Sequence, residues 1–126
     1  MEMNRRLFEQ MVFKIASEVL ESLPDVFKNN DKEIIFLVAD KPAKEDTDND
    51  ADDEDTLGLY EGTPLIERSV NDNDIIPARI TIFRLPFLDM CDNIKELKKE
   101  VRLTILHELG HHFGFDEKDL EELGLG

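Results

Sequence analysis

Apolar residues recur every three or four positions between Asn4 and Leu23, which is the spacing of one face of an α-helix. Pro24 follows at once and cannot continue a helix, because its ring lacks the N–H donor. We therefore predict an amphipathic helix that covers the core. Its apolar face is formed by Leu7, Phe8, Met11, Val12, Ile15, Val19 and Leu23.

Three later runs have the composition of β-strands. Residues 33–39 are a β-branched and aromatic run, which predicts a strand buried on both faces. Residues 57–62 alternate apolar with small or polar side chains and lead into a Gly-Thr-Pro turn signal. Residues 78–85 predict a strand that stops at Pro86. The two faces of this strand carry Ile80, Ile82 and Arg84, and Thr81, Phe83 and Leu85.

A second long helix is predicted after Asp92. Asn93, with Glu96 three residues later, resembles a capping box at its start. Gly114 marks its end, because glycine accepts the left-handed conformation that a helix terminus often needs. Its buried stripe is expected to contain Ile94, Leu97, Val101, Ile105, Leu106, Leu109 and Phe113.

The order of these elements predicts a small α+β fold. It contains an N-terminal helix, a three-stranded sheet and the second long helix, followed by a short C-terminal helix at about 117–123 with Asp116 as its cap. The 126 residues fit one domain, 1–126, without internal repeats.

Negative charge is concentrated in one segment. The chain has 15 Lys and Arg against 30 Asp and Glu, a formal net charge of −15. Residues 40–55 hold nine acids and two lysines, a net of −7, so we expect an acidic flexible loop at about 40–56. A calcium loop is disfavoured because Asp55 stands where an EF-hand needs glycine. The overall charge argues against a nucleic-acid or anionic-membrane partner.

Cysteine usage and hydropathy indicate the cellular compartment. One Cys cannot form an internal disulfide, which suits a reducing environment. The N-terminal region has no uninterrupted apolar core of the secretory type, and no stretch approaches the roughly 20 apolar residues that span a bilayer. We therefore expect a cytoplasmic protein. The sequence does not fix its oligomeric state.

All three histidines fall within six residues, at positions 107, 111 and 112. Helix residues four apart are turned by about 400°, so His107 and His111 point the same way. With Glu108 they form the H-E-x-x-H pattern of zinc hydrolases. Neutral imidazoles hold Zn²⁺ and leave a position for water, whose pKa the metal lowers towards about 7. Glu108 is placed to take the water's proton and pass it to a leaving amine.

The residues beyond this helix offer a third ligand. Gly114 is the seventh residue after His107 and lets the chain turn back under the metal. Glu117 is the tenth, where the extended motif H-E-x-x-H-x-x-G-x-x-H has its last His. A carboxylate oxygen can fill that place.

Residues 107–117, with the sequence HELGHHFGFDE, resemble the signature of the minimal zincin-like metallopeptidase family. This family comprises short, mostly bacterial predicted zinc peptidases. The likeness extends to residues 57–65 and 79–84, and covers roughly residues 1–120 apart from the acidic loop.

The resemblance implies a minimal zincin-like fold, one Zn²⁺ per chain, two histidine ligands, a glutamate base and an acidic third ligand. Residue by residue, it assigns these roles to His107 and His111, to Glu108 and to the acid at the tenth position. The family's usual acid there is Asp, whereas this chain has Glu117 preceded by Asp116. Glu117 is favoured as the ligand because its extra methylene lengthens its reach, and Asp116 is the alternative.

Three further side chains are candidates for roles around the site. His112 points about 100° from His111, which favours packing or a supporting hydrogen bond over ligation. Tyr60 is a candidate to stabilise an oxyanion, although a strand Tyr more often packs. Arg84 is a candidate to bind a substrate carboxylate, with solvent exposure or an ion pair as the favoured alternative.

The leading functional hypothesis is a zinc metallopeptidase that acts on a peptide or protein substrate. The substrate is expected to pair with an edge strand of the sheet, and residues 79–84 are the candidate for that strand. The alternative is a zincin-like metal-binding or interaction module with little turnover. A metal-dependent endoribonuclease is a weaker hypothesis. The tail 114–117 resembles the end of a motif in a bacterial rRNA-maturation family, but that family has Gly in place of Glu108 and His in place of Glu117.

Overall fold

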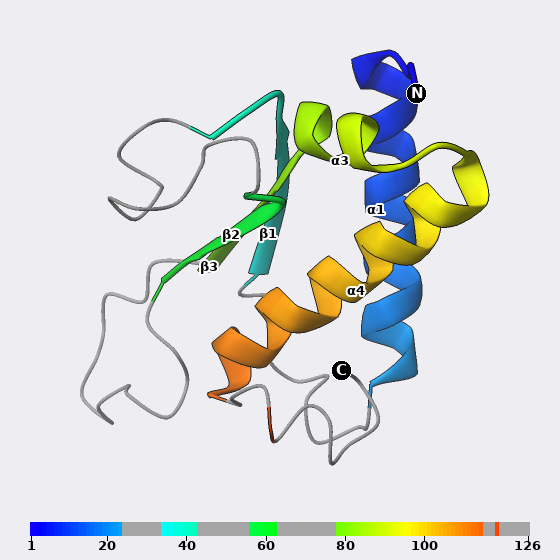
Figure 1. The fold of residues 1–126 in the computed structure, drawn as a ribbon. Coiled ribbons are helices and arrows are strands. Elements are labelled where there is room, and N and C mark those ends of the chain that lie inside the picture. Colours follow the sequence, from blue (N-terminus) through cyan, green and yellow to red (C-terminus); the bar gives the residue numbers. More distant parts are fainter. Residues whose placement is uncertain (24–33, 43–55, 63–77, 115–117, 119–126) are drawn as a thin grey trace.

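The computed structural model describes residues 1–23, 34–42, 56–62, 78–114 and 118. The described elements, drawn in Figure 1, are α1 (Arg5–Ser22), β1 (Ile34–Ala39), β2 (Gly58–Glu61), β3 (Ala78–Phe83), α3 (Arg84–Met90) and α4 (Ile94–Phe113). The α+β class predicted from the sequence is confirmed. The acidic segment 43–55 and, apart from Lys118, the predicted C-terminal helix at 117–123 lie outside the described residues.

Helix α1 forms where the apolar spacing predicts it. The side chain of Asn4 caps its start by accepting a hydrogen bond of 2.9 Å from the N–H of Leu7. Phe8, Val12 and Val19 are fully buried on the inner face. Leu7, which was predicted to lie on that face, is exposed instead.

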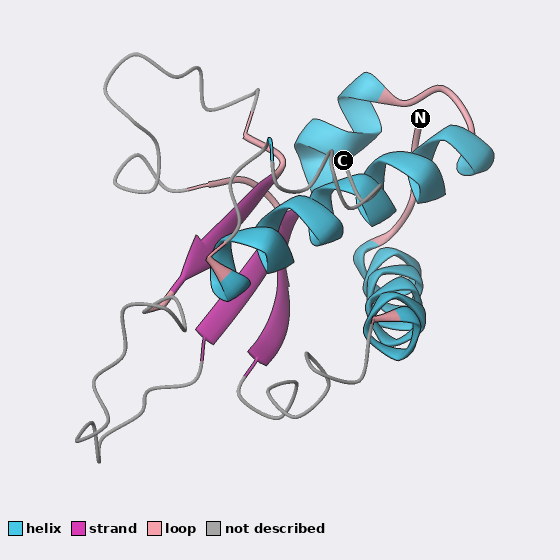
Figure 2. Cartoon of the chain, turned by 90° about the horizontal axis from the view of Figure 1, so that it is seen from below, coloured by secondary structure: helices cyan, strands magenta, loops and turns pink. Residues whose placement is uncertain are grey.

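The three strands form a mixed sheet in the order β1-β3-β2. Strand β1 is parallel to the central strand β3, and β2 is antiparallel to it. Helices α1 and α4 lie on one face of this sheet (Figure 2). The prediction that β1 is buried on both faces is therefore wrong. On its other face Ile35 and Leu37 are 44% and 41% exposed, because neither of these helices packs there.

Strand β3 ends earlier than predicted. Residues 84–90 form the short helix α3, so Arg84 and Leu85 do not continue the two faces of the strand. Pro86 is the third residue of α3, where the missing N–H has no partner within the helix in any case. This proline lies in the first turn of a helix, a position that a sequence cannot distinguish from the stop of a strand.

Helix α4 has both predicted ends. The side chain of Asn93 accepts a hydrogen bond of 2.8 Å from the N–H of Glu96. Gly114 adopts the left-handed conformation with φ of 81°. The predicted stripe is buried except for Ile94, which is exposed on the first turn. The helix packs against α1, β2, β3 and α3, and crosses α1 beside the sheet (Figure 1).

The core lies between the sheet and these two long helices. Its fully buried side chains include Phe8 of α1, Ile80 and Ile82 of β3, and Leu97 of α4. Among the described segments, no helix is both long enough and apolar enough to cross a membrane.

Candidate metal centre

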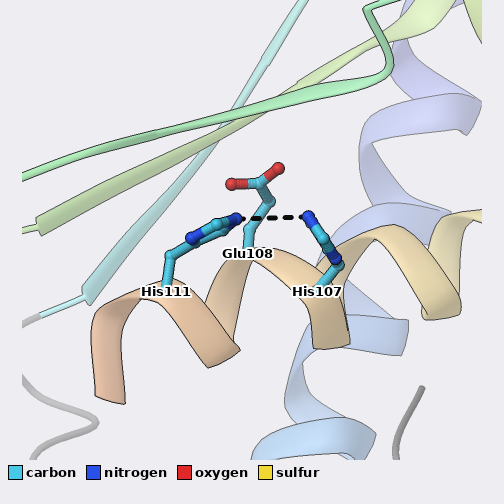
Figure 3. A group of neighbouring side chains, drawn as sticks. All are labelled: His107, Glu108 and His111. Carbon is cyan, nitrogen blue, oxygen red and sulfur yellow. Dashed lines mark hydrogen bonds between the residues drawn. The ribbon is translucent and has the colours of Figure 1, made fainter. Parts of the chain in front are cut away.

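The last two turns of α4 bring two imidazoles together. The Nε2 atoms of His107 and His111 lie 3.2 Å apart, and the rings meet edge to face with their centroids 4.8 Å apart. Figure 3 shows the two rings facing each other on one side of the helix. Two nitrogens bound to one tetrahedral zinc ion at about 2.05 Å are about 3.3 Å apart. The observed separation therefore fits two nitrogen ligands of one ion.

Glu108 completes a group of three possible donors. One donor atom from each of His107, Glu108 and His111 can be chosen so that all lie within 4.8 Å of one another. The carboxylate points from α4 towards the strands (Figure 3). Two imidazoles and a nearby carboxylate suit zinc among the common protein metals.

The environment of Glu108 differs from that of its two neighbours. Glu108 is only 9% exposed, whereas His107 is half-buried and His111 is exposed. Burial raises the pKa of the Glu108 carboxyl, while the charge of His111 and a hydrogen bond from the backbone N–H of Tyr60 act in the opposite direction. A carboxylate with a raised pKa is a better proton acceptor near neutral pH.

Strand β2 lies directly against this part of α4. Gly58 and Tyr60 pair with Ile82 and Ile80, whose side chains face the helices, so the helix-facing positions of β2 are 58 and 60. A Cβ atom on Gly58 would come within 2.8 Å of the Thr104 methyl carbon and 3.5 Å of Cγ of Glu108. Glycine at position 58 therefore permits the close approach of strand and helix.

Two hollows flank Glu108 along β2. One of about 370 Å³ lies on the side of His107 and is bordered by Leu57, Leu103 and Thr104. The other, of about 350 Å³, lies on the side of His111 and is bordered by Leu59, Tyr60 and Gly62. Gly58 and Glu108 border both. The candidate centre thus opens to space on each side of the carboxylate.

His112 and Tyr60 are brought together by the fold. His112 is fully buried, and its Nδ1 lies 2.9 Å from the Tyr60 hydroxyl. His112 does not join the donor group of His107, Glu108 and His111. The hydrogen bond turns the Tyr60 hydroxyl towards α4, and the supporting role of His112 stays a prediction.

Arg84 lies apart from this group. Its Nε is 2.9 Å from a carboxylate oxygen of Asp40, and its Nη1 donates to the backbone oxygen of Met3 at 2.7 Å. Arg84 is thus ion-paired, which was the alternative favoured over substrate binding. The hydrogen bond from Arg84 holds the pKa of Asp40 below its ordinary value.

Cys91 is buried at the end of α3. Burial raises the pKa of its thiol, and the charges of Glu96, Glu100 and Asp92 raise it further. It contributes to the core and has the properties of an inert thiol.

The predicted third ligand, Glu117, and its alternative, Asp116, lie outside the described residues. The expectation that residues 79–84 form an edge strand is wrong. Strand β3 is the centre of the sheet, and among the described strands β2 is the edge that lies beside α4.

The hollow near His107 is bordered by Leu57, Leu103 and Thr104, which were not among the predicted site residues. Leu103 lies four residues before His107, so the helical period that groups the two histidines also places Leu103 on their face. That signal was available. The approach of Gly58 to Thr104 joins residues far apart in the chain, and no local pattern encodes it.

One comparison with known protein families gives a match. A family model described as zincin-like metallopeptidase matches residues 32–126, which include all three strands and the whole of α4. No curated protein matches the chain.

Proposed function

The chain belongs to the zincin-like metallopeptidase family, and from this premise we propose that it is a zinc-dependent peptidase. The observation that carries the proposal is the convergence of the His107 and His111 Nε2 atoms, 3.2 Å apart, beside the buried carboxylate of Glu108. In this proposal the two histidines hold zinc, and Glu117 completes the site, with Asp116 as the alternative.

Zinc bound here would supply a Lewis acid that polarises a peptide carbonyl and makes a water molecule more acidic. Glu108 accepts the proton of the attacking water and later transfers it to the leaving amine. Its burial beneath β2 supports this role, because a carboxylate that is shielded from bulk water is held where it can accept and return the proton.

The substrate is proposed to be a peptide in extended conformation. Among the described strands, β2 is the edge of the sheet beside α4, and an edge strand can pair with a peptide backbone through the groups that remain beside the Tyr60 N–H, which is hydrogen-bonded to Glu108. The two hollows on either side of Glu108 then receive side chains on either side of the cleaved bond.

Incubation of zinc-loaded protein with a diverse peptide library tests the proposal. We expect cleavage by the wild type and a loss of about 10²–10⁴-fold in Glu108→Ala, the contribution typical of a general base. Glu100→Ala removes a carboxylate from the same helix outside the donor group and is expected to cleave normally.

Two outcomes would contradict the proposal. One is cleavage that is equal in wild type and Glu108→Ala. The other is one tightly bound zinc ion per chain with no cleavage of any peptide, which would favour a metal-binding or interaction module. RNA offered at low salt is expected neither to bind nor to be cut, because the chain carries a net charge of −15.

A further inference from the structure

We propose that Tyr60 is a positioning residue that holds the Glu108 carboxylate in place, and that its hydrogen bond with the buried His112 fixes it in that role. The inference rests on the proposed peptidase function for its effect on turnover. Its structural part, the attachment of β2 to α4 through Tyr60, stands independently of any activity.

Helix α4 carries two pairs of residues four positions apart in its last two turns. His107 and His111 form one pair, with His111 at the surface. Glu108 and His112 form the other, rotated by about 100° from the first and buried. The first pair contains the proposed metal ligands, and the second faces β2.

Tyr60 contacts both members of the buried pair. A Cβ on its strand neighbour Gly58 would lie 3.5 Å from Cγ of Glu108, and a hydrogen bond from the Tyr60 backbone N–H lowers the pKa of the Glu108 carboxyl, so this amide lies beside the carboxylate. The Tyr60 hydroxyl lies 2.9 Å from Nδ1 of His112, and the two ring centroids are 5.7 Å apart. One residue of β2 is therefore attached to α4 at two points separated by one helical turn.

The neighbouring glycines allow this attachment. Gly58 lets the strand approach Glu108 and Thr104, because a Cβ atom at this position would collide with the Thr104 methyl carbon. A Cβ on Gly62 would lie 3.3 Å from the Tyr60 hydroxyl and 3.1 Å from the backbone of Ala78. Glycine at position 58 therefore leaves room for the helix, and glycine at position 62 leaves room for the Tyr60 hydroxyl.

The two attachments have different consequences. The backbone hydrogen bond aligns one carboxylate oxygen, and it holds only while residue 60 stays at a fixed distance from α4. The side-chain hydrogen bond supplies that constraint, because His112 is fully buried and cannot follow a moving strand. Tyr60 thus acts on the reaction through Glu108 and does not itself touch the reacting atoms.

The first test uses steady-state kinetics on a peptide that the wild type cleaves. Tyr60→Phe keeps the ring and removes the hydroxyl, and is expected to lower kcat about five- to tenfold with little change in KM or in zinc content. His112→Asn keeps a polar atom near the place of Nδ1 and should retain more of kcat than His112→Leu. In the double variant Tyr60→Phe/His112→Leu, the loss should not exceed that of the worse single variant, because both remove the same hydrogen bond.

The second test needs no activity. Hydrogen exchange of the residue 60 amide, followed by NMR in zinc-free protein, reports directly on its hydrogen bond to Glu108. We expect exchange to accelerate about tenfold in both Tyr60→Phe and Glu108→Ala, while the amides of β3 keep their protection. Ser22→Ala removes a hydroxyl that donates to the backbone oxygen of Val19 within α1, and should leave amide 60 unchanged.

These two readouts separate the possible failures. If the wild type cleaves no peptide, the proposed function fails while amide 60 still decides the role of Tyr60. If amide 60 is equally protected in Tyr60→Phe and the wild type, the positioning role is overturned whatever the activity. An unchanged kcat in Tyr60→Phe, or losses that multiply in the double variant, would also overturn it. Should His112→Leu fail to fold, Tyr60→Phe alone decides the outcome.

Discussion

The two long helices, α1 and α4, use their buried faces differently. Helix α1 buries only apolar residues, from Phe8 to Val19. Helix α4 buries apolar residues over its first turns and then adds Glu108 and His112 near its end. Burying an ionisable group costs stability unless the group is hydrogen-bonded. The C-terminal end of α4 is therefore less favourable for folding stability than α1, and it places ionisable side chains at the candidate metal centre.

The largest effect that we expect on stability follows a change in α1. Phe8 is fully buried and its ring centroid lies 6.2 Å from that of Phe87. Phe8→Ala should lower the free energy of unfolding by about 3–5 kcal/mol, measured by urea denaturation of zinc-free protein. Glu108→Gln is the matched change in α4 and should leave that free energy equal or higher, because it replaces a buried charge by a neutral amide of similar size. A large loss of unfolding free energy in Glu108→Gln would contradict the view that the buried end of α4 does not contribute to stability as the buried face of α1 does.

A medium effect is expected where β2 meets α4. Gly58→Ala places a methyl group within 2.8 Å of the Thr104 methyl carbon, which forces the strand away from the helix. We expect a loss of about 1–3 kcal/mol in unfolding free energy together with reduced kcat. Thr104→Ser removes that methyl, so Gly58→Ala/Thr104→Ser should recover most of both losses. A double variant as impaired as Gly58→Ala would show that the collision is elsewhere.

A smaller effect should be equal in the two helices. Asn4 and Asn93 cap α1 and α4 with hydrogen bonds of 2.9 Å and 2.8 Å to backbone N–H groups. Alanine at either position should cost about 1 kcal/mol in thermal or urea unfolding, without loss of kcat in the folded protein. If Asn93→Ala abolished turnover while Asn4→Ala did not, the N-terminal cap of α4 would be needed for the activity of the metal centre at the other end of the helix.

The smallest effect depends on pH. The folded-state pKa of Asp40 lies below its ordinary value of 3.8, mainly because Arg84 donates a hydrogen bond to it. Its contribution to stability is therefore present above about that pH and is lost as the pH falls through the lower folded value. The difference in unfolding free energy between wild type and Asp40→Asn should be small at pH 7 and vanish in acid. Because neither residue belongs to the donor group of His107, Glu108 and His111, kcat should not change.

The sequence predicted what short-range periodicity encodes. Both caps of α4 and the placing of His107, Glu108 and His111 on consecutive turns follow from residues within a few positions of one another. The features that it missed depend on contacts between distant segments. Strand order makes β2 the edge, and the partner of His112 lies 52 residues away. Local patterns also failed at Pro86, because a proline can either end a strand or lie in the first turn of a helix.

Cys91 gives the protein a built-in reporter of opening. It is the chain's one cysteine, and it is buried between α3 and α4 with a raised thiol pKa. A thiol-reactive dye can therefore modify the chain only while that junction is open, so the labelling rate follows the population of opened molecules. Added zinc should slow labelling if the ion bound on α4 stabilises the whole fold, and this effect can be followed without any substrate.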